Sequence, residues 1–474
     1  MRNRSNIFIF FIVLALLFWN PISYYLFYGK ASFYHSSVLH FIFWLSPIVG
    51  IGFIFLIKKN KISQKTKNLI FSLSFLLFFY GFLVILNSAI GFFIKLDNEF
   101  ITSGTYFKKG LIFEPNSIAR YSTVEFDFTA EINSLGLRDR EMVIDKGNQF
   151  RVLCFGDSWT MGWGVELEHS WPKQLEKILH SQGYKNIEVI NCGKDDAYTT
   201  LYKKYMSEAV PLLKPDLVLV GILQLDDLAQ LYENNFFIDN FYKQSKSISL
   251  LDVVKSIYNT KDFIRESFNN IIYIARNIAK EDIIEIKENW KRSSNRQIQE
   301  FNHLQILRFN TLDETVQNLF KTGNLNPAIL YYDINFPDRL AIFNNPNHLA
   351  TIFALKEMDR DVNEMKNICQ ENEAELVFIN LPDSIFTGHN VVCNSLDILN
   401  SYFLENNNID LMYKSIASSN ELQYIELTER FIELKDKKAY FYTYDGHPNE
   451  NGYREIAKLI GEKLIIMDII KEEK

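Results

Sequence analysis

Residues 151–164, RVLCFGDSWTMGWG, give the clearest indication of the fold. In this stretch an apolar run is followed directly by Gly156, Asp157 and Ser158. A short apolar run that ends in a glycine turn is typical of a buried parallel strand followed by a helix. Open α/β sheets bind their ligands at the carboxyl ends of such strands, so the Ser158 hydroxyl is expected at a ligand-binding edge. Taken alone, a Gly-Asp-Ser tripeptide is also common in ordinary turns.

The same strand-and-helix pattern continues on both sides of this run. Further apolar runs predict strands at 187–191, 216–222, 375–380 and 422–427, and helical spacing predicts helices at 170–182, 201–213, 349–371 and 449–467. Strands that alternate with helices indicate an α/β fold with a doubly wound parallel sheet. We expect residues 151–235 and 348–474 to form the two parts of this domain.

The region between these two parts, residues 236–347, has no regular alternation of strand and helix. Helices are predicted at 250–273, 281–308 and 312–320, an extra strand at 329–334, and a turn rich in Pro and Asn at 335–347. The sequence therefore predicts a mainly helical insert. We interpret it as a cap beside the strand ends or as the surface for a protein partner.

Three long apolar runs precede the α/β pattern, at 7–28, 38–57 and 69–94. Each is long enough to cross about 30 Å of hydrocarbon as a helix, and a signal peptide explains only one of them. The alternative is three buried core helices, which in soluble proteins rarely hold such long apolar runs. Residues 1–95 are therefore predicted to be an anchor of three transmembrane helices.

The distribution of Lys and Arg predicts how this anchor is oriented. Arg2 and Arg4 precede the first run and five lysines lie between 58 and 67, whereas the first loop carries only Lys30. This places the chain in the cytoplasmic membrane as a multi-pass protein, with residues 95–474 in the periplasm or outside the cell. Residues 96–150 are predicted as an extracytoplasmic linker, with a strand at 121–132.

Composition and spacing exclude several classes of protein. The net charge of −7 argues against electrostatic binding of nucleic acid. Four cysteines in 474 residues are too few for a disulfide scaffold. The histidines and cysteines lack the spacing of metal ligands, so neither a metal nor another cofactor is predicted.

A second candidate motif lies at 444–452, YDGHPNENG, just before the last predicted helix. Pro448 and Asn449 are residues that favour a helix start. Residues two apart in an extended segment face the same side, so Asp445 can reach and orient the ring of His447. A histidine oriented in this way beside a serine activates the serine as a nucleophile. The alternative is that the segment only caps the helix.

With Gly-Asp-Ser after the first strand and Asp-x-His before the last helix, the chain resembles the SGNH (GDSL-type) hydrolase family over 151–230 and 348–467. The resemblance implies a flavodoxin-like, three-layer fold and acyl-ester chemistry. It also implies that Ser158 is the nucleophile, His447 the general base and Asp445 the carboxylate that orients it. The segment NSLGLR at 133–138 is similar to that of membrane-anchored bacterial members.

Two positions depart from the pattern of that family around the oxyanion. Asp196 stands where the family has a glycine, and Asp226 stands where it has an asparagine that donates to the oxyanion. An ionised aspartate cannot donate a hydrogen bond. The candidate oxyanion residues are therefore Ser158, Asp196 and Asp226, with Gln224 as a replacement donor.

Two functions remain open on these residues. The first is a membrane-anchored esterase or O-acyltransferase, in which Ser158 attacks an acyl ester of a cell-envelope polysaccharide and water or a sugar hydroxyl then accepts the acyl group. The second is a non-catalytic protein of the same fold that binds or assembles glycan. The departures at Asp196 and Asp226 favour the second function, whereas the presence of Ser158, Asp445 and His447 favours the first.

Overall fold

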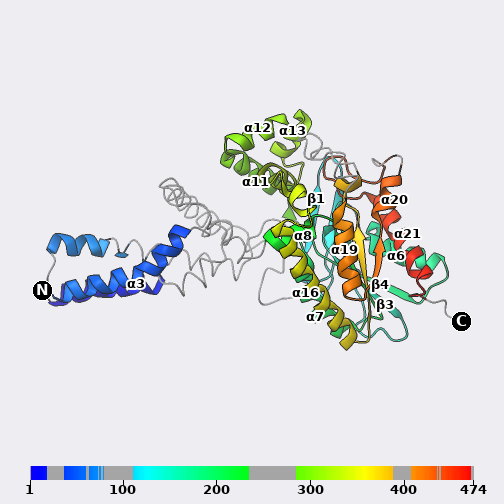
Figure 1. Ribbon diagram of the computed structural model, residues 1–474, viewed down its shortest axis with the longest axis horizontal. Helices are drawn as coiled ribbons and strands as arrows, with labels where there is room; N and C mark the ends of the chain where they lie inside the picture. The colour runs from blue at the N-terminus through cyan, green and yellow to red at the C-terminus, as the bar shows by residue number, and fades with distance from the viewer. Residues whose placement is uncertain are drawn as a thin grey trace. The chain divides into compact units, whose positions relative to one another are not determined.

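The computed structural model describes residues 2–18, 37–59, 63–72, 74–75, 78, 110–233, 284–387, 407–434, 436 and 439–470. The chain divides into two compact units. One holds the N-terminal helices, and the other holds every described strand together with the helices around them (Figure 1).

The N-terminal unit contains the helices α1 (Arg2–Phe18) and α3 (Ser37–Lys58), which pack against each other. Ile12, Ile57 and Ile70 form its buried cluster. Within the described ranges, none of the helices combines the length and the apolar character that a membrane crossing requires. The first and third predicted spans extend beyond these ranges, and the transmembrane anchor stays a prediction.

The larger unit is built on a five-stranded sheet. Its strands are β3 (Phe150–Gly156), β4 (Ile187–Gly193), β5 (Leu217–Leu223), β7 (Glu375–Leu381) and β8 (Gln423–Glu426). They are all parallel and lie in the order β4-β3-β5-β7-β8. This is the flavodoxin-like order, which confirms the predicted α/β fold with a doubly wound parallel sheet.

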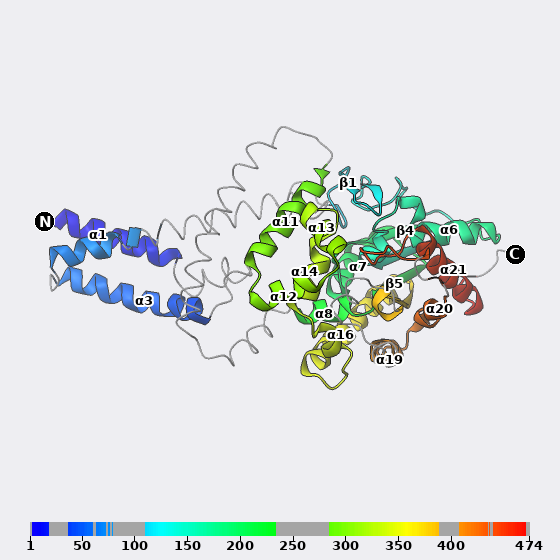
Figure 2. The ribbon, with the colours of Figure 1, turned by 90° about the horizontal axis from the view of Figure 1, so that it is seen from above.

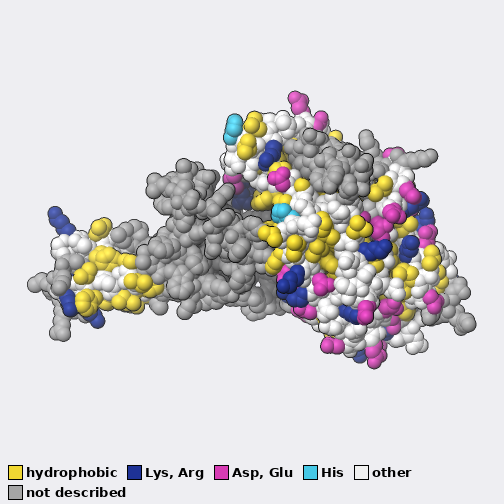
Figure 3. All heavy atoms as spheres, in the orientation of Figure 1, with side chains coloured by type: hydrophobic (Ala, Val, Ile, Leu, Met, Phe, Trp, Pro, Cys, Tyr) yellow, Lys and Arg dark blue, Asp and Glu magenta, His cyan; other side chains and the backbone are white. Residues whose placement is uncertain are grey.

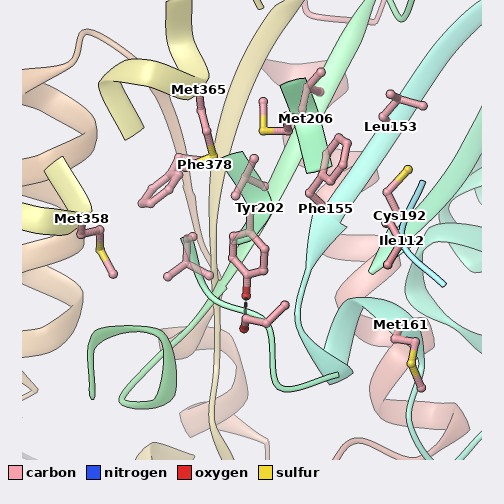
Figure 4. Packing of buried hydrophobic residues seen from close by; sticks show 14 of the residues in the cluster. Ile112, Leu153, Phe155, Met161, Cys192, Tyr202, Met206, Met358, Met365 and Phe378 are labelled. Atoms are coloured by element: carbon pink, nitrogen blue, oxygen red, sulfur yellow. Dashed lines mark hydrogen bonds between the residues drawn. The ribbon is translucent and has the colours of Figure 1, made fainter. Parts of the chain in front are cut away.

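Helices cover both faces of this sheet. One face carries α6 (Trp171–Ser181) and α21 (Glu450–Ile466), and the other carries α7 (Thr199–Leu213), α16 (Leu349–Glu371) and α19 (Asn408–Ser419). Successive residues of β3 point to opposite faces, so that Leu153 and Phe155 join one buried cluster and Val152 and Cys154 the other. Figure 4 shows Phe155 in the first cluster, with Tyr202 and Met206 of α7.

A small second sheet takes two strands from before the large sheet in the chain and a third from the insert. It is made of β2 (Asp127–Glu131), β1 (Ile118–Ser122) and β6 (Ile284–Glu285), with β1 antiparallel to β2 and parallel to β6. The single strand predicted at 121–132 is therefore wrong, because the chain turns at 123–126. The Thr123 N–H donates to the Phe126 carbonyl over 2.8 Å, and the Thr123 hydroxyl accepts from the N–H of Glu125. Apolar and polar residues keep alternating through this turn, which hides it in the sequence.

Apart from β6, the described part of the insert is helical. Its helices are α11 (Lys287–Glu300), α12 (His303–Thr311), α13 (Glu314–Thr322), α14 (Pro327–Asn335) and α15 (Arg339–Phe343), and α11 to α14 lie together beside the large sheet (Figure 2). They belong to the same compact unit as that sheet, as do the described residues from 110 to 149. The bounds predicted for the linker and the insert stay predictions.

Three predictions within the insert are wrong. The helix at 281–308 is interrupted, because Asn302 starts α12 with a capping box that includes Gln305. The strand at 329–334 is helix α14, which Asn326 caps by accepting from the N–H of Ala328. The turn at 335–347 contains the short helix α15. The predicted helix at 250–273 lies outside the described residues.

The surface of the two units differs on the face that Figure 3 shows. Hydrophobic side chains gather on the N-terminal helices, whereas basic and acidic side chains are interspersed over the larger unit. On α3, Ile48, Ile51 and Phe55 have exposed fractions of 69%, 63% and 55%.

Candidate active site

The candidate residues from distant parts of the sequence meet at the carboxyl edge of the large sheet. Ser158 is the first residue of α5 (Ser158–Met161), directly after β3. Asp226 is the first residue of α8 (Asp226–Glu233), after β5, and His447 lies just before α21. Since β3 and β5 are neighbours at the point where the strand order reverses, this edge is where such sheets bind ligands.

Ser158, His447 and Asp445 form a continuous chain of hydrogen bonds. The distance from Ser158 Oγ to His447 Nε2 is 2.8 Å, and that from His447 Nδ1 to Asp445 Oδ1 is 2.6 Å. The side chain of Asp445 is only 4% exposed, and that of His447 is 17% exposed. The imidazole therefore lies where it can take the proton of Ser158 while a carboxylate holds its other nitrogen.

The surroundings of His447 favour its charged form. Burial lowers the pKa of His447, but the negative charges of Asp445, Asp157 and Asp383 outweigh this effect and raise the pKa above its ordinary value of 6.5. A raised pKa stabilises the imidazolium that forms when His447 accepts a proton, so the environment suits a general base.

Trp163 provides a further hydrogen bond to the buried carboxylate. Its Nε1–H donates to Asp445 Oδ2 over 3.2 Å. The indole is buried and packs against aromatic rings of the β1–β2 hairpin, since its centroid lies 4.9 Å from that of Tyr121, 5.8 Å from Phe126 and 5.6 Å from Phe128. The hairpin thereby fixes the position of Trp163, whose Nε1–H bonds to Asp445.

Glu125, in the turn of the same hairpin, binds the backbone of residues 443–445, in the loop that carries His447. Its carboxylate accepts from the N–H groups of Thr443, Tyr444 and Asp445, with shortest distances of 2.6, 3.1 and 2.9 Å. Burial raises the pKa of Glu125, although these backbone N–H groups act to lower it. Glu125 and Asp445 are 320 positions apart in the chain, and the sequence analysis missed the contact.

Arg138 fixes the loop that follows Ser158 and α5. Its Nη1 donates to the carbonyls of Met161 (2.8 Å) and Gly162 (2.7 Å), and its Nη2 donates to that of Val165 (2.7 Å). The residue is fully buried, and burial lowers the pKa of Arg138 to about 10, so it stays charged at neutral pH. Through Arg138, the segment NSLGLR therefore holds the backbone that follows Ser158 in place.

The side chains of two candidate oxyanion residues, Gln224 and Asp196, bond to other residues and do not line the pocket over Ser158. The amide nitrogen of Gln224 donates to Asp410 and, over 3.0 Å, to Thr428, while its oxygen accepts from the N–H of Asp383. The role of replacement donor predicted for Gln224 is therefore wrong in this conformation, because its amide is already fully bonded. Asp196 is exposed and accepts from Gln230 over 2.9 Å.

Asp226 lies in the site but is paired with a cation. Its Oδ1 accepts from Arg339 Nη1 over 2.5 Å, and Arg339 Nε donates to Glu233 over 2.9 Å. Arg339 comes from the insert and is 8% exposed. The carboxylate that replaces the expected asparagine is thus held by an arginine that the sequence analysis did not single out.

A pocket of about 150 Å³ opens over Ser158. Its wall on the sheet side includes Ser158, Trp159, Leu223, Leu225, Asp226, Asp383, Ser384, Ile385, Asp445, Gly446 and His447, and the insert supplies Ile329, Tyr332, Asp333, Phe336, Pro337, Arg339 and Leu340. Asp196 and Gln224 are not part of this wall. Among the described residues, no group of His, Cys, Asp and Glu side chains is arranged to hold a metal ion.

The chain is similar to several known proteins in structure but not in sequence. No family profile and no curated protein sequence matches the chain. Similar solved structures include the lipase/acylhydrolase from Enterococcus faecalis (TM-score 0.33, 11% identity, 68% of this chain and 98% of that chain). Others are an acetyl xylan esterase (0.32, 12%, 66% and 99%) and AlinE4, a SGNH-hydrolase family esterase (0.29, 12%, 69% and 99%). At these TM-scores the likeness does not establish a family, and the chemistry of the site rests on its own side chains.

Proposed function

We propose that this protein is a serine hydrolase that cleaves acyl esters. The observation that carries the proposal is the pair of hydrogen bonds from Ser158 Oγ to His447 Nε2 (2.8 Å) and from His447 Nδ1 to Asp445 Oδ1 (2.6 Å). Ser158 Oγ attacks the ester carbonyl while its proton passes to His447 Nε2. The carbon–oxygen bond to the alcohol then breaks, and the leaving oxygen takes the proton from His447.

The acyl-enzyme is resolved by a second nucleophile, which His447 deprotonates in the same way. Water gives an esterase, and a sugar hydroxyl gives an O-acyltransferase. The pocket of about 150 Å³ favours a short acyl group, because an engineered protein cavity of similar volume holds a molecule the size of benzene. We infer that acetyl esters of cell-envelope polysaccharide are the substrate class.

We further propose that the site works at the outer face of the cytoplasmic membrane. The support is the three apolar runs, the Lys and Arg bias around them and the exposed Ile48, Ile51 and Phe55 of α3. Alkaline phosphatase, which is active only outside the cytoplasm, tests this when it is fused after Lys65 or after Gly110. We expect activity only from the second fusion, and activity from the first alone would contradict the proposed orientation.

Labelling with a fluorophosphonate tests the hydrolase itself. We expect the wild-type chain to become covalently labelled at Ser158, and both Ser158→Ala and His447→Ala to lose the label while their thermal unfolding stays close to that of the wild type. Hydrolysis of p-nitrophenyl acetate and of acetylated polysaccharides then distinguishes substrates. A folded wild-type chain that takes no label would overturn the proposal.

The second candidate function is a glycan-binding protein without catalysis. The observation that favours it is the carboxylate of Asp226 in the wall of the pocket, since a negative charge there opposes an oxyanion. This function predicts no fluorophosphonate label together with measurable binding of polysaccharide that Ser158→Ala leaves unchanged.

A further inference from the structure

Ester cleavage at Ser158 develops negative charge in a pocket that is already acidic. The carboxylates of Asp226, Asp333, Asp383 and Asp445 all line it. Burial raises the pKa of Asp383 to about 6, so this group is ionised at neutral pH. A tetrahedral oxyanion in such a site needs a strong compensating donor, because electrostatic interactions are strengthened where water is excluded.

Arg339 is the only Lys or Arg among the described residues that line this pocket. Its guanidinium is held from three sides, by Asp226, by Glu233 and by the ring of Tyr332, whose centroid lies 4.3 Å away. The hydrogen bonds to described residues use Nε, one N–H of Nη1 and one of Nη2. A guanidinium has five N–H groups, so one on each terminal nitrogen is left for a ligand.

We propose that Arg339 stabilises the oxyanion in this site, an inference that rests on the proposed ester hydrolysis. When Ser158 Oγ bonds to the carbonyl carbon, the carbon–oxygen π bond opens and its electron pair moves to the carbonyl oxygen. The remaining N–H groups of Arg339 donate to that oxygen, together with the backbone N–H of Ser158. When the tetrahedral adduct collapses, the carbonyl re-forms and the alcohol leaves with the proton from His447.

The ion pairs of Arg339 also indicate which esters the pocket accepts. The two carboxylates of Asp226 and Glu233 already more than offset the single positive charge of the guanidinium in the resting site. A substrate that carries its own carboxylate would meet this paired arginine and the other pocket carboxylates. We therefore infer a neutral acyl ester, and expect p-nitrophenyl acetate to react at least 10-fold faster than the corresponding hemisuccinate ester.

The rate of fluorophosphonate labelling in the full chain tests the role of Arg339, because the reagent forms a tetrahedral adduct at Ser158 with an oxygen in the oxyanion position. We expect Arg339→Gln to lower the second-order rate constant by about 10²- to 10³-fold, and Arg339→Lys to lower it less. The matched control is Arg308→Gln, because Arg308 is an insert arginine that donates to the Ile334 carbonyl and does not line the pocket. Its rate should equal that of the wild type.

A second set of variants separates donation from simple charge balance. In Asp226→Ala/Glu233→Gln/Arg339→Gln the two carboxylates disappear with the arginine. Labelling as slow as that of Arg339→Gln supports donation by Arg339, whereas labelling at the wild-type rate overturns it. Equal labelling rates for the wild type and Arg339→Gln also overturn it. A wild type without label instead refutes the proposed function, and thermal unfolding of each variant confirms that it is folded.

Discussion

His447 determines how the site responds to pH. The charges of Asp445, Asp157 and Asp383 outweigh burial and raise its pKa above 6.5, and only the neutral imidazole can accept the proton of Ser158. Activity should therefore be lost as the pH falls through this raised pKa. We expect the acidic limb of kcat/KM for p-nitrophenyl acetate to have its midpoint above pH 6.5.

Asp445→Asn separates the charge of this carboxylate from its shape. Removing the charge takes away the largest contribution that raises the pKa of His447, so the acidic midpoint should move to lower pH. The plateau rate should fall by about 10⁴-fold, as it does in a serine protease when the equivalent aspartate is changed. A midpoint in Asp445→Asn at or above that of the wild type would show that Asp445 does not set the pKa of His447.

Gly193 is a residue whose lack of a side chain matters for the position of Ser158. A Cβ at this position would lie 2.2 Å from the backbone nitrogen of Met161 and 2.5 Å from the carbonyl carbon of Thr160, so α5 would have to move. A displacement of about 1 Å at the reacting atoms costs about 10²-fold in rate. We expect Gly193→Ala to lower kcat by this amount, while Gly52→Ala, which meets nothing within 4 Å, leaves kcat unchanged.

At the scale of elements, the β1–β2 hairpin holds residues 443–445, in the loop that carries His447, through Glu125. In Glu125→Gln one carboxylate oxygen becomes an NH₂ group that faces the N–H groups of Thr443, Tyr444 and Asp445, so two donors meet and the loop shifts. We expect kcat to fall by about 10- to 100-fold with a smaller change in KM, because the loop positions His447 but supplies only three of the residues that line the pocket.

Asp127→Asn is the matched control on the same hairpin. The carboxylate of Asp127 pairs with Arg120, and both side chains are 50% exposed, so the pair contributes little to the stability of the hairpin. Its kinetics should equal those of the wild type. A Glu125→Gln variant that raises KM instead of lowering kcat would place Glu125 in substrate binding.

The elements that the sequence predicts well are those with a local signal. The central strands are continuous apolar runs, and α16 has clear helical spacing, so both agree with the structure to within a few residues. Residues 329–334 form a helix although their short apolar run also suits a strand, because Asn326 and Pro327 start a helix there. Periodicity alone does not distinguish these two outcomes over six residues.

At the scale of the whole molecule, the strand order brings Ser158, Asp226 and His447 to one edge, and this part of the site follows from the sequence. The contacts that complete it connect Glu125 to 443–445 and Asp226 to Arg339. They join elements that lie far apart in the chain, and no local pattern indicates which charged side chain will meet which. For the same reason, no local pattern in the predicted linker, residues 96–150, indicates that its described part belongs to the larger unit.

Arg138 tests whether this N-terminal segment stabilises the larger unit as a whole. In Arg138→Met the buried carbonyls of Met161, Gly162 and Val165 lose their donor, and each unpaired buried group costs about 1–3 kcal/mol. We expect the free energy of unfolding in urea to fall by at least about 3 kcal/mol. Asp127→Asn, which removes the charge of a half-exposed ion pair from the same segment, should leave the free energy of unfolding close to that of the wild type. Equal unfolding midpoints for Arg138→Met and the wild type would mean that the segment only lies against the domain and does not hold it together.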